Sequence, residues 1–269
     1  MSGSTRLQSP YLIAPETWVI PQIEAAGPDR FVSINSMVIT ATEPVIVDTG
    51  CAINREQWLA DTFAIVEPAD VRWIFLSHGD RDHVGNLAAL LEACPQATAI
   101  TTMWGLRYLL ADGAPPLERV RWVNDGESFD AGDRTLAAVR PPMWDATSTR
   151  GLFDVKTGVY WAADSFASMF THPVTDASQL DHEFWRCSFI EEHRSYCEWL
   201  TVIDPSKFEA RIANTERLAR MVASAHGPTL SGAMVPEAYR LLHEIASMQP
   251  LPAPGQTVLD QMVGQLVAA

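Results

Sequence analysis

Basic residues are scarce in this 269-residue chain. Its 19 lysines and arginines stand against 33 aspartates and glutamates, which gives a formal net charge of −14. Such an acidic protein has no excess of cations to replace the counterions of nucleic acid, and it is repelled by anionic membrane surfaces. The chain also lacks any run of 18 consecutive apolar residues, so no membrane-spanning helix is expected. We therefore expect a small-molecule substrate, and neither nucleic acid nor membrane as a partner.

Cysteine is also rare, and a secretion signal is missing. The first 18 residues lack the basic start and continuous apolar run of a signal peptide, so a cytoplasmic location is expected. The four cysteines lie far apart, form no C-x-x-C pair and are expected to be reduced thiols with structural roles. They are Cys51, Cys94, Cys187 and Cys197.

Long linkers, low-complexity tracts and internal repeats are absent as well. With 47% hydrophobic residues the chain can bury a large core, and its length suits a single domain over residues 1–269. In the first half, strand-like and helix-like segments alternate, and the last hundred residues are more helical. This order favours an α/β fold in which sheets pack between helices.

Several segments have clear strand or helix patterns. Strands are predicted at residues 17–23, 31–40, 44–50 and 71–78, and helical spacing begins at His83. The segments 44–50 and 71–78 are short apolar runs, which are typical of buried strands. The pattern predicts further strands and helices later in the chain. The strands are 97–102, 119–123, 134–139 and 158–163, and the helices are 183–202, 207–221 and 236–248.

Four possible metal ligands occur within six residues: His78, Asp80, Asp82 and His83. They lie where an apolar strand ends and a helix begins, which is where α/β proteins place their sites. Imidazole and carboxylate groups together suit a borderline or hard divalent metal ion. A charged turn in which Asp82 caps the helix is the simpler alternative. Capping alone does not explain two histidines and two aspartates at this spacing.

The segment His-Gly-Asp-Arg-Asp-His resembles the H-x-H-x-D-H signature of the metallo-β-lactamase superfamily, with Asp80 at the second histidine position. A carboxylate there, usually glutamate, is the mark of the flavodiiron and oxygen-binding diiron branch. The resemblance runs from about residue 30 to 230, and Val-Asp-Thr-Gly at 47–50 matches the first superfamily motif. It implies an αβ/βα four-layer sandwich, with two mixed β-sheets between helices.

The resemblance also implies a set of ligands. Asp164, in Ala-Ala-Asp-Ser-Phe, matches the aspartate that bridges two metals, and His226, in Ser-Ala-His-Gly-Pro, matches the last histidine ligand. The first metal would be held by His78 and Asp80, and the second by Asp82, His83 and His226. Asp82 and Asp164 are the expected catalytic residues. Asp48 is expected to orient a ligand histidine from behind.

One ligand of the family pattern is missing. Met143 stands where the family has a histidine before a tryptophan, and a thioether is a poor ligand for iron or zinc. Asp145 could supply an oxygen instead, the position could stay open or hold water, or one metal could be lost. His172 and His182 are further substitutes. The expected cofactors are two divalent metal ions, iron rather than zinc, or only one of them.

Aromatic and basic residues near these motifs suggest a substrate pocket. Trp104, Trp144 and Trp161 flank the motifs and are candidates to line an apolar pocket, and Arg81 is a candidate to face the substrate. His193 and His243 lie in predicted amphipathic helices and are expected to be structural.

Three functions follow from this site. A hydroxide formed from metal-bound water would make the protein a hydrolase for a small neutral or aromatic ester, amide or activated ether, which is the main hypothesis. The first alternative is a non-hydrolytic diiron protein that binds or reduces O2 or nitric oxide. No flavodoxin domain or cysteine-rich iron–sulfur motif follows in this sequence, so a partner would supply electrons. The second alternative is a degenerate subunit that pairs with a catalytic paralogue. The flavodiiron resemblance also suggests a homodimer.

Overall fold

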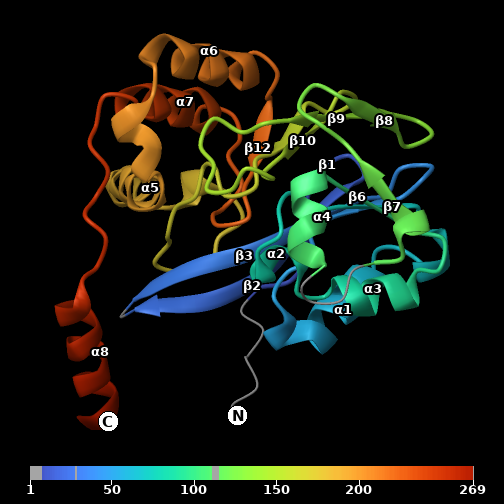
Figure 1. The fold of residues 1–269 in the computed structure, drawn as a ribbon, viewed down its shortest axis with the longest axis horizontal. Helices are drawn as coiled ribbons and strands as arrows, with labels where there is room; N and C mark the ends of the chain where they lie inside the picture. Colours follow the sequence, from blue (N-terminus) through green and yellow to red (C-terminus); the bar gives the residue numbers. More distant parts are fainter. Residues whose placement is uncertain (1–7, 28, 111–114, 269) are drawn as a thin grey trace.

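Two β-sheets lie face to face with helices on both outer surfaces in the computed structural model (Figure 1). The structure describes residues 8–27, 29–110 and 115–268. The predicted αβ/βα four-layer sandwich is therefore confirmed. Residues 1–7 of the segment compared with signal peptides lie outside the described residues. No helix in the described part of the chain is both long enough and apolar enough to cross a lipid bilayer.

The first sheet contains seven strands in chain order. A long antiparallel hairpin, β2 and β3, leads into β4, and the strands from β4 to β7 pair in parallel. β4 and β5 are wholly or almost wholly buried, as their continuous apolar sequences predict. The strands are β1 (Tyr11–Ala14), β2 (Thr17–Gly27), β3 (Arg30–Ile39), β4 (Val45–Val47), β5 (Trp73–Phe75), β6 (Thr98–Thr101) and β7 (Val120–Trp122).

The second sheet has five strands in the order β12-β11-β10-β9-β8. All neighbours pair antiparallel except β11 and β12, which run parallel and so end at the same edge. The strands are β8 (Ser128–Asp130), β9 (Thr135–Val139), β10 (Gly151–Asp154), β11 (Val159–Trp161) and β12 (Met221–Ala223).

The helices divide between the two outer faces (Figure 1). Those before β8 cover the first sheet, and α5 to α7 cover the second. The helices are α1 (Arg55–Phe63), α2 (Arg81–Val84), α3 (Leu87–Ala93), α4 (Met103–Leu109), α5 (His182–Tyr196), α6 (Pro205–Glu216), α7 (Met234–Ile245) and α8 (Gln256–Ala268). The carboxylates of Asp181 and Asp204 cap α5 and α6 by accepting backbone N–H groups of the first turn.

Three apolar clusters hold the layers together. The central cluster lies between the sheets and joins Val47 and Phe75 of the first sheet to Leu152 and Trp161 of the second. Another cluster packs α1 and α3 on the first sheet. The third packs α5, α6 and α7 on the second sheet, and it contains Met143. The sheets are thus buried on both faces, and their loop ends are the places where polar groups can gather.

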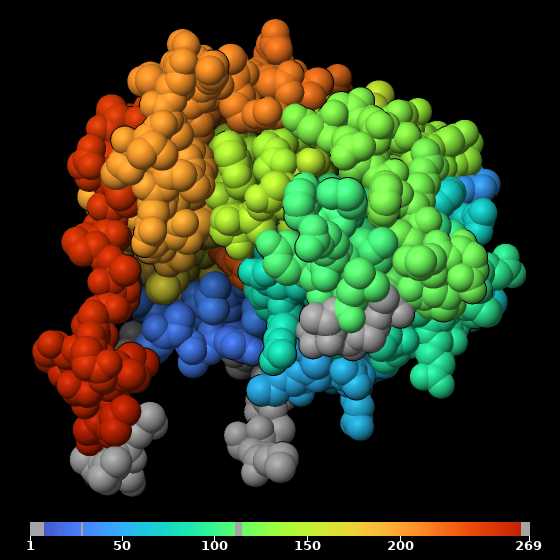
Figure 2. Space-filling model, viewed as in Figure 1, coloured from blue at the N-terminus to red at the C-terminus, as the bar shows by residue number. Residues whose placement is uncertain are grey.

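The structure also corrects the sequence prediction at several elements. β1, β8, β10 and α8 were not predicted, and α8 extends away from the body of the protein (Figure 2). The predicted helix 183–202 ends at Tyr196 and is followed by a 3-10 helix, Glu198–Val202. The predicted helix 207–221 ends at Glu216, because Met221 begins β12.

Candidate metal centre

The predicted ligands come from the loops that follow four different strands. His78, Asp80, Asp82 and His83 lie between β5 and the end of α2, Asp164 follows β11, and His226 follows β12. Since β11 and β12 are parallel neighbours, their following loops emerge at the same edge, opposite the loop after β5. The loop between β9 and β10 brings Asp145 to the same place. The fold therefore gathers side chains that are up to 148 residues apart, from 78 to 226, into one site.

A first group of donor atoms surrounds His78. Its Nε2 atom lies 3.4 Å from Asp164 Oδ2, 3.8 Å from Asp80 Oδ2 and 3.8 Å from Asp145 Oδ2. The imidazole is buried, whereas the Asp80 side chain is 59% exposed. This group therefore opens toward solvent on the side of its carboxylates.

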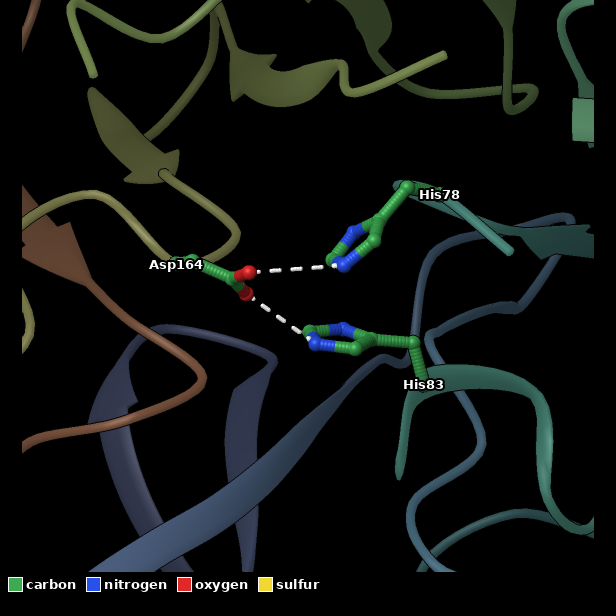
Figure 3. A group of neighbouring side chains, drawn as sticks. All are labelled: His78, His83 and Asp164. Atoms are coloured by element: carbon green, nitrogen blue, oxygen red, sulfur yellow. Dashed lines mark ion pairs between the residues drawn. The ribbon is translucent and has the colours of Figure 1, made fainter. Parts of the chain in front are cut away.

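A second group surrounds His83 and His226. The Nε2 atoms of these histidines lie 3.4 and 3.3 Å from Asp82 Oδ2, and 3.0 and 3.3 Å from Asp164 Oδ1. Asp164 thus offers one carboxylate oxygen to each group, as Figure 3 shows for His78 and His83. This is the geometry of a carboxylate that bridges two ions.

These residues fit a pair of metal ions. Two donors that each lie about 2.1 Å from one ion are about 3.0 to 3.4 Å apart, close to the spacings found here. Three of the atoms at the centre, His78 Nε2, His83 Nε2 and Asp164 Oδ1, are fully buried and have no hydrogen-bond partner. Burying such atoms without a partner is costly, and a cation between them would satisfy all three.

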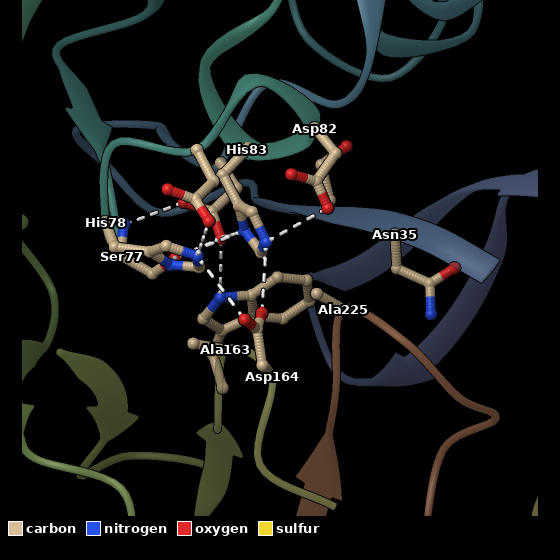
Figure 4. A network of polar contacts seen from close by, with 12 residues as sticks. Asn35, Ser77, His78, Asp82, His83, Ala163, Asp164 and Ala225 are labelled. Carbon is tan, nitrogen blue, oxygen red and sulfur yellow. Dashed lines mark hydrogen bonds and ion pairs between the residues drawn. The ribbon is translucent and has the colours of Figure 1, made fainter. Parts of the chain in front are cut away.

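A layer of hydrogen bonds behind the histidines fixes their rings (Figure 4). His83 Nδ1 lies 3.0 Å from Asp48 Oδ2, and His78 Nδ1 lies 3.0 Å from Ser77 Oγ. His226 Nδ1 donates to the backbone carbonyl of Ser33 at 2.9 Å. In each ring the Nε2 atom is thereby directed to the centre. Sequence reasoning proposed Asp48 for this kind of contact but did not find Ser77 or the Ser33 carbonyl.

Asp48 connects several groups of this hydrogen-bonded layer. Its fully buried carboxylate accepts the backbone N–H and hydroxyl of Ser77, both at 2.7 Å, and the indole N–H of Trp161 at 3.0 Å, besides facing His83. Its backbone is in the left-handed region, with φ of 55°, which is uncommon outside glycine. Asp48 therefore connects the loop after β5, which carries the ligands, to strand β11 of the second sheet.

Replacing Asp48 with asparagine is expected to destabilise the metal-free protein by about 2–4 kcal/mol, because buried donors lose an anionic acceptor. Urea unfolding of the metal-free protein measures this. Asp29→Asn is the matched control, because Asp29 also has a left-handed backbone, φ 53°, but is exposed. A change no larger than that of the control would show that the Asp48 network does not contribute to stability.

The charges of the metal-free centre hold protons on its histidines. Burial lowers the pKa of His226, but Asp164 and Asp82 outweigh burial and raise it to about 10. Burial raises the pKa of Asp82, but the hydrogen bond from His226 and the charge of His83 lower it to about 2. The pKa of Asp164 lies well below its usual range because three histidines face it. A metal ion would take the place of these protons.

Met143 does not take part in this centre. Its side chain is fully buried in the apolar cluster between the second sheet and α5 to α7. Asp145, two residues later, places its carboxylate beside His78 instead. Of the alternatives left open by the sequence, the geometry favours an oxygen ligand from Asp145. His172 and His182 lie elsewhere, near Thr171 and Glu237 respectively.

The described residues do not bring the three predicted tryptophans into one cavity with Arg81. Trp161 is fully buried between the sheets and donates to Asp48, so it cannot face a substrate. Trp144 stacks on Trp199 with ring centres 4.5 Å apart, and Trp104 is 45% exposed on α4. Arg81 lines a cavity of about 560 Å³, but none of the three tryptophans does. Sequence proximity to the motifs was therefore a poor guide to the pocket.

The two histidines expected to be structural have partners away from the centre. His193 is buried in α5, where Nε2 accepts the backbone N–H of Phe166 at 2.8 Å and Nδ1 donates to the carbonyl of Phe189. His243 lies on α7 and faces Glu209.

The sequence of this chain is similar to a known protein family and to several curated proteins. Residues 29–152 match the model of the Metallo-beta-lactamase superfamily. Among curated relatives, diflavin flavoprotein A 1 of Synechocystis is 25% identical over 73% of this chain and 34% of its own length. Type A flavoprotein fprA of Rhodobacter capsulatus is 27% identical over 73% of this chain and 45% of its own length. The nitric oxide reductase of Moorella thermoacetica is 26% identical over 56% of this chain and 38% of its own length.

Solved structures agree in fold. Rubredoxin oxygen:oxidoreductase of Desulfovibrio gigas matches 90% of this chain and 63% of its own with a TM-score of 0.80 at 17% identity. The flavodiiron protein of Giardia intestinalis matches 90% of this chain and 60% of its own with a TM-score of 0.78 at 16% identity. The chain spans only about a third to less than half of the length of the curated relatives it matches.

These comparisons overturn the main functional hypothesis drawn from the sequence. The relatives and structural neighbours carry the names of flavoproteins and of oxygen or nitric oxide reductases, and none of those named above is a hydrolase. The hydrolase hypothesis was wrong because it followed the superfamily's commonest chemistry. The carboxylate at position 80 was the better guide to the branch.

Proposed function

Since the chain carries a metallo-β-lactamase superfamily domain with flavodiiron proteins among its relatives and structural neighbours, we propose that it is a diiron oxidoreductase that reduces O2 or nitric oxide. The observation that carries this proposal is Asp164, whose two oxygens face two separate groups of imidazole and carboxylate donors. One group is His78, Asp80 and Asp145, and the other is Asp82, His83 and His226.

The donor set supports iron as the metal. All seven side chains present imidazole nitrogen or carboxylate oxygen, and no thiolate joins the groups found among the described residues. Such hard and borderline donors suit iron, whereas a closed structural zinc site usually contains cysteine. With four carboxylates and three imidazoles, the ligands carry four negative charges when the imidazoles are neutral. These charges balance two divalent ions.

The chain's own residues shape the reaction site. Asp164 would offer one oxygen to each ion, and Asp48 and Ser77 hold the buried imidazoles in position. Asp80, Asp82 and Asp145 are partly exposed, so a small gas molecule reaches the centre from their side. Iron bound here supplies redox electrons and open coordination positions for O2 or nitric oxide. Continued turnover needs an external electron donor, such as a reduced flavin or iron–sulfur protein.

Metal-free protein is expected to lose stability between pH 7 and pH 10. The pKa of His226 is raised to about 10 in the folded state. The protonated imidazole therefore stabilises the folded protein fully below the ordinary histidine pKa, and this stabilisation is lost as the pH rises toward 10. Deprotonation of His226 removes one of the two imidazolium charges that face both Asp82 and Asp164, and His83 alone is then left between these carboxylates. Bound metal should remove this loss, because it replaces the proton. Thermal unfolding across this pH range measures both states.

His226→Gln is the control for this pH dependence. The variant should show a smaller difference between metal-free protein at pH 7 and at pH 10 than the unmodified chain. An equal difference in both proteins would assign the effect to other groups and contradict the proposed charge balance.

We also propose that the protein forms a homodimer. The flavodiiron resemblance supports this proposal, and α8 exposes four apolar side chains that a second copy could cover: Val258, Leu259, Met262 and Val263. Light scattering during gel filtration distinguishes a dimer from a monomer or from a complex that requires a paralogous subunit.

A further inference from the structure

Two arginines in the loop between β9 and β10 lie close together and share one backbone acceptor. Arg140 donates through Nη2 and Arg150 through Nη1 to the same atom, the backbone carbonyl oxygen of Thr147, at 2.9 and 3.3 Å. Two guanidinium groups that share one acceptor must lie within a few ångströms of each other. Their like charges repel, so their closeness needs compensation.

The surrounding charges supply little compensation. Asp125 is the one carboxylate among the described residues whose charge favours the charged forms of both arginines, and it already pairs with Arg211 of α6 at 2.8 Å. Its other oxygen accepts the backbone N–H of Arg140 at 2.7 Å. Three guanidinium groups thus share one carboxylate. This is a local excess of positive charge in a chain whose formal net charge is −14.

Arg150 is also incompletely hydrogen-bonded. Arg150 is 8% exposed, and its Nε atom is buried with no hydrogen-bond partner among the described residues. A buried donor on a charged group that lacks a partner is costly, so such groups are normally paired. Burial, with the added repulsion from Arg150, lowers the pKa of Arg140 to about 10. The pair is therefore arranged for an anion that supplies several oxygen atoms.

A purely structural role explains only part of this arrangement. Arg150 Nη1 donates to the carbonyls of Thr147 and Thr149, and Arg140 donates to that of Thr147, so both arginines help to shape the loop. One arginine suffices to satisfy the Thr147 carbonyl. The second guanidinium and the unpaired Nε atom of Arg150 are left without explanation.

We propose that Arg140 and Arg150 form a binding site for a phosphate group, either free phosphate or the phosphate of a small organic monoester. A phosphate offers several oxygens and close to two negative charges near neutral pH, and guanidinium groups bind it through paired N–H donors. The excess of charge around Asp125 matches a dianion better than a single carboxylate.

This site is connected to the metal centre by the same loop. Thr149 Oγ1 donates to Asp145 Oδ1 at 3.2 Å, and the backbone N–H of Arg150 donates to the carbonyl of Ser77, next to His78, at 2.9 Å. The guanidinium of Arg140 lies 5.3 Å from the ring centre of Trp144, which stacks on Trp199. Phosphate bound at the arginines would therefore stiffen the loop that carries Asp145, and these indoles would report it.

The test is a titration of metal-free protein with inorganic phosphate at constant ionic strength, followed by calorimetry and tryptophan fluorescence. Adenosine monophosphate and succinate are titrated in parallel to distinguish free phosphate, a phosphate ester and a dicarboxylate. We expect saturable phosphate binding that weakens at least about tenfold in Arg140→Ala and in Arg150→Lys, because the bidentate donors are lost. Tighter binding of adenosine monophosphate than of phosphate would identify an ester as the ligand.

Arg107→Ala is the matched control, since Arg107 also lies over a tryptophan ring, Trp104, at 5.1 Å but, within the described part of the chain, shares no hydrogen-bond acceptor with a second arginine. Its phosphate affinity should equal that of the unmodified chain. Arg140→Ala is decisive even if Arg150→Lys fails to fold, because Arg140 is only half-buried. The proposal is overturned if phosphate does not bind saturably, if succinate binds as well as phosphate, or if Arg140→Ala binds phosphate normally. The assay needs no metal, so its outcome is independent of the proposed oxidoreductase function.

Discussion

Asp164→Ala should lose both metal ions at once. One oxygen of Asp164 lies 3.4 Å from His78 Nε2, and the other lies 3.0 and 3.3 Å from the Nε2 atoms of His83 and His226. Removing it takes a ligand from both groups and leaves two clusters without the carboxylate that joins them. We expect the affinity for iron to fall by at least about 100-fold, more than is typical for a residue behind the ligands. Iron per chain by elemental analysis, after desalting, measures the loss.

Cys187→Ala is the control for this variant. Cys187 is exposed on α5 and donates a hydrogen bond to Glu183, so its replacement should leave metal content unchanged. Circular dichroism should confirm that Asp164→Ala still folds. Full metal content in a folded Asp164→Ala protein would show that Asp164 is not a shared ligand.

Asp145→Ala should lose one metal ion and keep the other. Asp145 Oδ2 lies 3.8 Å from His78 Nε2, and Asp145 belongs to the first donor group alone. Without it, the first ion would keep three protein ligands, His78, Asp80 and one oxygen of Asp164, whereas the second ion would keep four, so the first ion should bind more weakly than the second. The second group keeps Asp82, His83 and His226. We therefore expect the metal content after desalting, measured by elemental analysis, to fall from about two ions per chain to about one, because the ion with fewer ligands is lost first.

Asp70→Asn serves as the matched control, since Asp70 is an exposed aspartate in a short 3-10 helix remote from the centre. Met143→His provides a second comparison. Because the Met143 side chain is fully buried among apolar residues, a histidine there should destabilise the protein and should not raise metal content. A gain of metal in Met143→His, or unchanged metal in Asp145→Ala, would contradict the role proposed for Asp145.

The contiguous part of the site was predictable from the sequence. His78 to His83 follow a buried strand in a spacing that suits metal binding, and the short motifs around Asp48, Asp164 and His226 matched the superfamily. The sandwich followed from the same resemblance. Asp145 was only one alternative, because its role depends on how the loop between β9 and β10 turns. That turn buries Met143 and directs Asp145 to His78, which no local pattern encodes.

Other features were missed for physical reasons. Trp161 was assigned to a pocket from its place beside the Asp164 motif, but β11 is buried on both sides and its tryptophan points to Asp48. β8 is three residues long and β10 four, too short for alternation to be recognised. The hydrolase hypothesis failed because the same carboxylate and imidazole donors serve hydrolysis and oxygen chemistry. Spacing alone does not separate the two reactions.

Oxygen uptake by protein loaded anaerobically with Fe(II) tests the central claim most directly. The account predicts rapid uptake of about one O2 per two Fe(II) from a diiron centre in a single turnover, and continued uptake once an electron donor is added. The uptake should fall to the rate of free Fe(II) in Asp164→Ala. Uptake by the unmodified chain at no more than the rate of free Fe(II), with nitric oxide equally unreactive, would contradict the assignment of a diiron oxidoreductase.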